Sequence, residues 1–356
     1  MLVSAPGKLV LAGEWAILEP GNPGIIAAIN RRVWIRLEEA EEFALKLKDF
    51  GLELKAEWNG ELKWERNLSP QEEKDTRFIK GAIETVAAYL GRIKPFRLES
   101  WGEDVQVEGK KIGFGSSAAS TVAAVKAILE FHGVRAEPQL IYKLSAISHY
   151  QVQKKLGSGF DVAASTWGGV FVYRRFDPEW LIGMIEERDV KEIVNQEWPG
   201  LEVRRLPVPD GLRLLVGWTG ESASTTDMIK QMNVFKERNY QEYQRIFKEI
   251  AETVKELIQR WEAEDKKGII ELLKRNRNLL SELTLKSGVE IETEKLKRLA
   301  DIAEEAGGAG KLSGAGGGDC GIAVCWDEET AERIKKGWKE AGLVPLDVGI
   351  DERGVG

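Results

Sequence analysis

Residues 307–321 read GGAGKLSGAGGGDCG, and eight of these fifteen residues are glycine. The 37 glycines in 356 residues would give a segment of this length about one or two. Ordering glycine is costly, so it is used where φ is positive or where the backbone must approach a ligand closely. A flexible linker would not lie between a predicted helix at 293–306 and the apolar stretch GIAVCW. The segment therefore predicts a loop whose amide groups face an anion.

A second glycine turn, GFGSSAAS at 113–120, ends a predicted strand and opens an alanine-rich helix. Exposed amides and the positive end of the helix dipole favour phosphate, and the hydroxyls of Ser116 and Ser117 would cap the helix or bind a phosphate-bound Mg²⁺. The pattern also satisfies the dinucleotide fingerprint G-x-G-x-x-A. That fingerprint belongs after the first strand of a βαβ unit, whereas this turn follows a run of strands. A plain serine-capped helix is the other alternative.

Three further segments carry candidate chemistry. Lys8, in APGKLVLAGEW at 5–15, lies between a predicted Pro-Gly turn and a predicted strand. It is placed to reach inward as a point charge, although a lysine in a turn is usually just solvated. Asp161, in GSGFD, either caps a helix or presents a carboxylate to a substrate. The hydroxyls of TGESASTT at 219–226 either cap a long helix or also face an acceptor phosphate.

Length and composition set the frame. The 356 residues exceed the ~250–300 at which single cores usually split, so two domains of an α+β protein are expected, with a boundary near residue 190. Helices are predicted at 226–260, 266–286 and 293–306. A net charge of −7, with no basic stripe, argues against nucleic-acid and membrane partners. No leader or long apolar run is present, so a cytoplasmic location is expected.

Histidine and cysteine are scarce. The two histidines and two cysteines are badly spaced for a zinc site, and the low histidine count argues against a Ser-His-Asp catalytic triad. His132 and His149 are given structural roles, His132 at a helix end and His149 within a helix.

Taken together and in order, APGKLVLAGEW, GFGSSAAS and KLSGAGGGDCG resemble the three motifs of the GHMP small-molecule kinase superfamily. Within it the sequence most resembles the bacterial-type phosphomevalonate kinases, through GKLVLAGEWAILEPG, GSGFDVAAS and LLVGWTGESASTTDMI. Trp15 stands where mevalonate kinases usually have histidine. The resemblance implies an N-terminal domain (1–190) like domain 2 of ribosomal protein S5 and a ferredoxin-like C-terminal domain (191–356). It also implies transfer of the γ-phosphoryl group of ATP to 5-phosphomevalonate, giving 5-diphosphomevalonate.

The resemblance also assigns roles by motif. Lys8 and Asp161 would be the catalytic pair, and Ser117 would help to ligate Mg²⁺. The nucleotide phosphates would be held by Gly113, Gly115, Ser116, Ser117 and Ala118. The acceptor or the transferred phosphate would be bound by Glu14, Ser158, Ser313, Gly314, Ala315, Gly316 and Gly317. The expected partners are these small molecules, and the expected assembly is a monomer or a homodimer.

Several alternatives stay open. The acceptor could be mevalonate or the substrate of another GHMP kinase, the enzyme could be a diphosphomevalonate decarboxylase, or the chain could be a non-catalytic sensor. A sensor has no need of Lys8 and Asp161. A phosphate-monoester acceptor, with a second pKa of about 6, is already ionised at pH 7 and needs little help from a base. The hypothesis is therefore that Asp161 orients Lys8 and the acceptor, while Lys8 offsets repulsion between the two phosphates.

Overall fold

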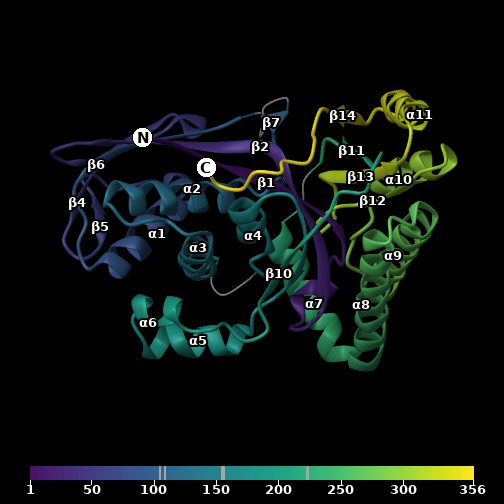
Figure 1. Cartoon of the computed structure of the whole chain (residues 1–356), viewed down its shortest axis with the longest axis horizontal. Coiled ribbons are helices and arrows are strands. Elements are labelled where there is room, and N and C mark those ends of the chain that lie inside the picture. The colour runs from purple at the N-terminus through teal and green to yellow at the C-terminus, as the bar shows by residue number, and fades with distance from the viewer. Residues whose placement is uncertain (104–105, 108–109, 154–156, 222–223) are drawn as a thin grey trace.

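The computed structural model describes residues 1–103, 106–107, 110–153, 157–221 and 224–356. It contains a large sheet covered by helices and a smaller sheet with long helices beside it (Figure 1). The large sheet has eight strands in the order β10-β9-β2-β6-β3-β4-β5, with β1 paired to β2. Its strands are β1 (Leu2–Ala12), β2 (Pro23–Glu39), β3 (Phe43–Leu47), β4 (Leu52–Trp58), β5 (Leu62–Trp64), β6 (Phe96–Gly102), β9 (Val170–Arg174) and β10 (Glu202–Leu206).

Strand β2 organises this sheet because it is long enough to serve three partners. It pairs with β1 along most of its length, with β9 at its start and with β6 at its end. Its first seven residues are all buried, after which burial becomes irregular, because the strand passes from the centre of the molecule to a half-exposed region. Two short helices, η1 (Ala16–Leu18) and η2 (Lys48–Phe50), and the ribbon β7 (Gln106–Val107) with β8 (Lys110–Lys111) complete the connections.

Four helices pack together and against the large sheet (Figure 1). They are α1 (Pro70–Leu90), α2 (Ser116–Phe131), α3 (Pro138–Val152) and α4 (Phe160–Trp167). The first has a complete capping box, in which Ser69 accepts from the backbone of Glu72 and Glu72 accepts from the backbone of Ser69. The centre of α2 is fully buried, which its small alanine side chains allow. Two further helices, α5 (Pro178–Glu187) and α6 (Val190–Asn195), follow β9.

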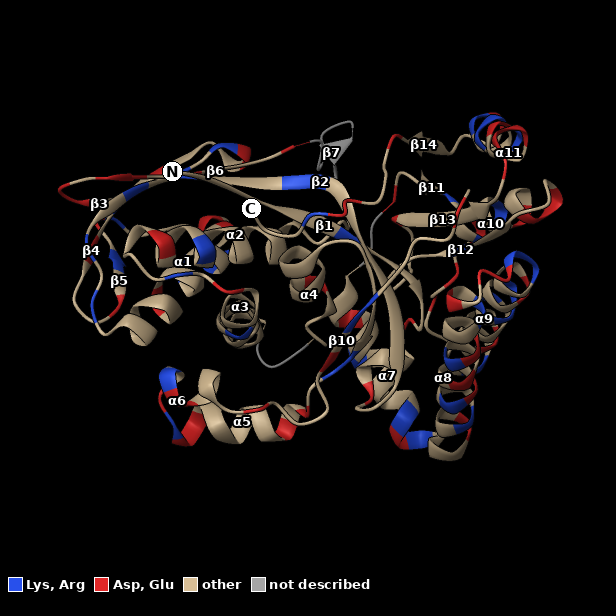
Figure 2. Cartoon of the chain, in the orientation of Figure 1, with Lys and Arg blue, Asp and Glu red and all other residues tan. Residues whose placement is uncertain are grey.

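The smaller sheet is antiparallel throughout, in the order β12-β13-β11-β14. Its strands are β11 (Arg213–Trp218), β12 (Ala309–Leu312), β13 (Cys320–Cys325) and β14 (Val344–Leu346). Its helices are α7 (Thr225–Arg238), α8 (Tyr240–Glu262), α9 (Lys266–Ser287), α10 (Glu294–Glu305) and α11 (Glu328–Glu340). Charges of both signs mix along α8 and α9 (Figure 2), and many form ion pairs, such as Arg245 with Glu249.

The predicted helix at 226–260 is wrong in one respect, because the structure has two helices that meet at Asn239. This residue has φ −134 and ψ 48, outside the helical region. Asparagine competes with the helix for backbone hydrogen bonds and so favours helix ends. No glycine or proline lies at this break, so the helical periodicity of the sequence predicts one continuous helix.

The two halves of the chain are interleaved at their ends. Strand β10 pairs with β9 in the large sheet, and the last residues of the chain return to that sheet, where Asp351 N donates to Ala28 O and Gly356 N donates to Ser4 O. Figure 1 shows both termini beside the large sheet. A domain division near residue 190 stays a prediction, and the pairing of β10 favours a crossover point after Leu206. No helix in the described part of the chain is long and apolar enough to cross a membrane.

Candidate active site

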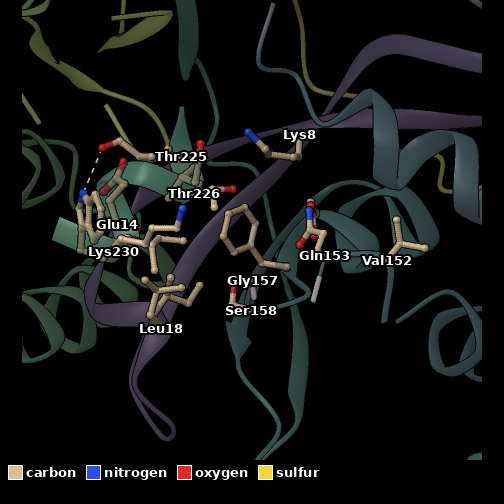
Figure 3. A pocket seen from close by; sticks show the side chains of 18 of the residues that line it. Lys8, Glu14, Leu18, Val152, Gln153, Gly157, Ser158, Thr225, Thr226 and Lys230 are labelled. Carbon is tan, nitrogen blue, oxygen red and sulfur yellow. Dashed lines mark hydrogen bonds between the residues drawn. The ribbon is translucent and has the colours of Figure 1, made fainter. Parts of the chain in front are cut away.

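A cavity of about 660 Å³ is lined by residues of β1, of helices α1, α3, α4 and α7, and of the loop between β12 and β13. Its lining includes six of the predicted site residues, namely Lys8, Glu14, Ser158, Asp161, Gly314 and Ala315. Figure 3 shows Lys8 between two groups of side chains, with Thr225, Thr226 and Lys230 to one side and Val152 and Gln153 to the other. The volume is that of a small-molecule site.

Lys8 reaches this cavity from a bulge within β1. The predicted Pro-Gly turn is wrong, since Pro6 and Gly7 lie inside the strand, where the register with β2 shifts by a bulge. A Cβ on Gly7 would lie 2.6 Å from Phe114 O, so the close approach of the two segments requires glycine. The backbone N–H of Lys8 donates to Phe114 O, and its Nζ donates to Gly113 O over 2.7 Å. Both ends of Lys8 are thereby tied to the turn before α2.

The turn before α2 leaves a helix N-terminus open. Gly115 is the N-cap with φ 81, and no side chain caps the helix. The oxygen of Ser116 is a buried side-chain atom with no hydrogen-bond partner among the described residues. A Cβ on Gly115 would lie 3.0 Å from Lys8 Cγ and 3.8 Å from Asp161 Cβ, so the predicted catalytic pair meets at this glycine. Amides of an uncapped helix N-terminus are suited to bind phosphate.

A second helix N-terminus carries Asp161. Gly159 is the N-cap of α4 with φ 82, again without a side-chain cap, and Asp161 Oδ1 accepts from the N–H of Val162 over 2.9 Å. The hydroxyls of Tyr142 and Tyr173 hydrogen-bond to each other, and a Cβ on Gly159 would lie 3.0 Å from the second of them. Tyr173 also donates to Ser158 O, so this buried tyrosine pair supports the turn that precedes Asp161.

Ser158, in the same turn, has an open hydrogen-bonding capacity. It is 3 % exposed, its hydroxyl has no partner among the described residues, and it lines the cavity. A buried polar atom without a partner is rare in folded proteins, because its desolvation is uncompensated. The arrangement favours a ligand atom as the missing partner.

The glycine-rich loop between β12 and β13 divides into two parts. Gly314 and Ala315 line the cavity, and a Cβ on Gly314 would lie 3.9 Å from Lys8 Nζ. Ser313 lies outside the lining, because its hydroxyl both accepts from Val10 N and donates to Val10 O. Gly316 and Gly317 pack on the backbone of Ile291, where a Cβ on Gly316 would lie 2.1 Å from the carbonyl oxygen. These three residues hold the loop against the protein.

Glu14 is tied to a lysine of the same loop. Lys311 Nζ donates to Glu14 Oε1 and, over 2.7 Å, to Leu312 O, and both charged side chains are almost fully buried. Burial raises the pKa of the Glu14 carboxyl and lowers the pKa of the Lys311 ammonium group. The second carboxylate oxygen of Glu14 has no partner among the described residues, and Glu14 lines the cavity.

Trp15 makes a second contact between the turn after β1 and the glycine-rich loop. Its φ of 65 and ψ of −54, with Ala16 N donating to Glu14 O, define a strained γ-turn. The indole N–H donates to Ala315 O over 3.1 Å. Such backbone strain persists only where the surroundings fix it and is common at functional sites.

His149, to which the sequence analysis gives a structural role within a helix, lies beside two of the predicted site residues. It is buried within α3, stacks on Phe78, and lies 3.4 Å from Ser117 Oγ and 3.9 Å from Asp161 Oδ2. Burial lowers the pKa of His149, with the Asp161 charge opposing and the Arg77 charge adding to this shift. His149 therefore stands as a neutral group between the predicted magnesium ligand and the predicted catalytic carboxylate.

Sequence reasoning missed two cations of the cavity, Arg77 from α1 and Lys230 from α7. Both lie in ordinary amphipathic helices, where a positive charge has no local signature. Of the segment 219–226, Ser224 caps α7 by accepting from Asp227 N, while Thr225 and Thr226 line the cavity. Residues 222–223 of that segment lie outside the described residues.

Comparison with known proteins agrees with this geometry. Residues 77–169 match the family model "GHMP kinases N terminal domain", and residues 245–343 match "GHMP kinases C terminal". The chain is 34 % identical to the phosphomevalonate kinase of Streptomyces sp. strain CL190, over 96 % of this chain and 95 % of the relative. The chain belongs to the GHMP kinase family.

Two other similarities bear on this GHMP kinase. A structure titled as Streptococcus pneumoniae phosphomevalonate kinase in complex with phosphomevalonate and AMPPNP has a TM-score of 0.86 at 27 % identity, covering 98 % of this chain and 99 % of that one. The mevalonate kinase of Methanocaldococcus jannaschii is 28 % identical, over 96 % of each chain. The predicted α+β GHMP kinase fold is confirmed, and so is the prediction of a phosphotransferase.

The side chains present fit the Mg²⁺ that the sequence predicts together with ATP. No cluster of three or more His, Cys, Asp or Glu side chains in the described residues could hold a metal by itself. Mg²⁺ usually keeps several waters and takes one or two protein oxygens together with substrate phosphates. Ser117, in the first turn of α2, supplies an oxygen of that kind.

Proposed function

We propose that this GHMP kinase transfers the γ-phosphoryl group of ATP to the phosphate of 5-phosphomevalonate, giving ADP and 5-diphosphomevalonate. The relatives named phosphomevalonate kinase support the acceptor, and the complex with phosphomevalonate and AMPPNP supports the pairing of acceptor and nucleotide. A cytoplasmic location and a monomeric or homodimeric state stay predictions from the sequence.

The observation that carries the proposal is the charge of the cavity. Among the described residues three cations line it, Lys8, Arg77 and Lys230, and Lys230 also pairs with the exposed Asp227 outside the lining. The described part of the lining has two carboxylates, of which Glu14 is already paired with Lys311, which leaves Asp161. An acceptor with a carboxylate and a phosphate carries about three negative charges at pH 7, whereas mevalonate carries one. The cavity therefore favours the phosphorylated acceptor.

The residues of the chain provide positioning and charge stabilisation, which is what phosphoryl transfer requires. The uncapped N-terminus of α2 would hold the nucleotide phosphates, with Gly113, Gly115, Ser116, Ser117 and Ala118 in or beside it. Lys8 lies where the turn before α2 and the Gly314 loop meet, so its ammonium group is placed to offset repulsion between donor and acceptor phosphates. Mg²⁺, held with ATP by Ser117, would neutralise charge on the nucleotide phosphates.

Asp161 and Ser158 would act on the acceptor side. Because the acceptor phosphate is already mostly ionised when it binds, catalysis needs little removal of a proton by Asp161. The position of Asp161 beside Gly115 and Lys8 suits orientation of the lysine. The unpartnered hydroxyl of Ser158 would donate to the acceptor. Gly314 and Ala315 would close the cavity near the transferred group.

The deciding experiment measures ADP release with Mg-ATP and each of 5-phosphomevalonate, mevalonate, homoserine and galactose, with mass spectrometry of the product. We expect the highest kcat/KM for 5-phosphomevalonate and a product heavier by one phosphoryl group. The Lys8→Met enzyme, purified identically, controls for contaminating kinases. A preference for mevalonate, release of CO₂ from diphosphomevalonate, or no ADP with any acceptor would each overturn the proposal, in favour of a mevalonate kinase, a decarboxylase or a sensor respectively.

A further inference from the structure

Asp319, at the end of the glycine-rich loop, has a backbone conformation that few side chains adopt. Its φ is 61, and among the described residues the other non-glycine residues with positive φ are Trp15 and Glu264. The conformation is fixed from outside, because Asp319 N donates to Glu221 O over 2.8 Å and Asp319 O accepts from Thr219 N over 2.9 Å. The segment after β11 thus holds Asp319 in a defined direction.

The side chain of Asp319 crosses from the small sheet to the nucleotide turn. Its Oδ1 accepts a hydrogen bond from the N–H of Gly113 over 3.1 Å. Its Oδ2 is so close that a Cβ on Gly113 would lie 1.9 Å from it. The contact therefore depends on glycine at position 113, and it joins two loops that are more than two hundred residues apart in the sequence.

Gly113 is held from both sides. Its N–H donates to Asp319, and its carbonyl oxygen accepts from Lys8 Nζ. Burial raises the pKa of the Asp319 carboxyl, while the nearby charge of Lys8 opposes this shift. The Asp319 carboxylate would repel a polyphosphate bound beside it. We therefore expect this carboxylate to have a function that outweighs the repulsion.

We propose that Asp319 is a positioning residue, whose carboxylate oxygen fixes the peptide of Gly113 and thereby sets the placement of Lys8 relative to the N-terminus of α2. Asp319 contacts Gly113, and Gly113 in turn contacts Lys8. The turn before α2 therefore has its phosphate-binding conformation only when the glycine-rich loop is in place. The inference rests on the proposed function in so far as this turn is where ATP binds.

The test compares Asp319→Gly with Asp319→Asn. Glycine adopts a positive φ without strain but removes the acceptor oxygen, whereas asparagine tolerates the conformation and retains an acceptor oxygen. We expect Asp319→Gly to keep the wild-type melting temperature, to bind ATP about ten- to a hundredfold more weakly in calorimetry without acceptor, and to lose kcat, while the KM for 5-phosphomevalonate changes less than about threefold. We expect Asp319→Asn to stay within about threefold of wild type. Glu264→Gly, at an exposed turn with φ 52, is the matched control for relief of strain and leaves ATP binding unchanged.

Two results would overturn the inference. The first is wild-type ATP affinity and kcat in Asp319→Gly. The second is an Asp319→Asn enzyme as impaired as Asp319→Gly, since the charge and not the hydrogen bond to Gly113 would then matter. Because ATP binding is measured without acceptor, a wild-type protein that binds ATP but does not phosphorylate 5-phosphomevalonate would refute the proposed function alone.

Discussion

Lys311 donates a hydrogen bond to Glu14 inside the protein, so that a buried ion pair joins the turn after β1 to β12. The pair brings two of the sequence motifs together, one from each end of the chain. A buried ion pair is weak evidence for stability as a whole, because desolvation offsets the attraction, but removal of one partner leaves an uncompensated buried charge.

Glu14→Gln should therefore destabilise the protein by about 3–5 kcal/mol, measured as the free energy of unfolding in urea. Glu14→Leu combined with Lys311→Met should recover most of this loss, because neither charge then remains buried. The control is Glu332→Gln, which breaks an exposed pair with Lys335 and should cost less than about 1 kcal/mol. If Glu14→Gln and Glu332→Gln lowered the free energy of unfolding equally, a structural role for the buried pair would be contradicted.

Lys8→Met should lower kcat by about a hundred- to a thousandfold, because it removes a positive charge from the point where the turn before α2 meets Gly314. Lys8→Arg should recover little, because the larger, planar guanidinium group cannot take the place of a compact ammonium group whose Nζ lies 2.7 Å from Gly113 O. Steady-state ADP release measures the effect. Lys63→Met, at an exposed position in β5, should have wild-type kcat, and a comparable loss there would point to a general effect of charge.

Asp161→Asn separates orientation from proton transfer. If Asp161 orients Lys8 and the acceptor, kcat should fall by only about tenfold, because asparagine keeps an oxygen for the N–H of Val162. If Asp161 is an essential base, the loss should approach the upper end of the 10²–10⁴ range of acid–base catalysis. A loss near that upper end, with 5-phosphomevalonate as acceptor and an unchanged melting temperature, would refute the orienting role.

The parts of the site that were predictable have a local signature. Glycine at positive φ is required at Gly115, Gly159 and Gly314, and each lies in a segment whose composition stands out in the sequence. Lys8 and Asp161 are predictable as site residues because they lie within or next to such segments. The fold followed from the order of these motifs and from their resemblance to one family.

The parts that were missed depend on tertiary packing. Arg77 and Lys230 are surface-type helical cations that become cavity residues because α1 and α7 line the same cavity as β1. His149 has no distinguishing neighbour in sequence, yet packing of α3 against α2 brings it to Ser117. Asp319 is a carboxylate within a glycine run, which is visible in the sequence, whereas its positive φ and its contact with Gly113 depend on tertiary packing.

His149 should make the stability of the protein fall in mild acid. Burial holds its folded-state pKa below the ordinary value of 6.5, so below pH 6.5 the unfolded chain binds a proton that the folded protein does not. Stability from this group is therefore present above pH 6.5 and is lost as the pH falls toward the folded-state pKa, by up to about 1 kcal/mol over the first unit. The measurement is the free energy of unfolding in urea at pH 7.5, 6.5 and 5.5, made in a His132→Gln background so that His149 is the one histidine left. Adding His149→Gln should flatten the slope between pH 6.5 and 5.5, and equal slopes with and without His149 would show that the imidazole is not held neutral between Ser117 and Asp161.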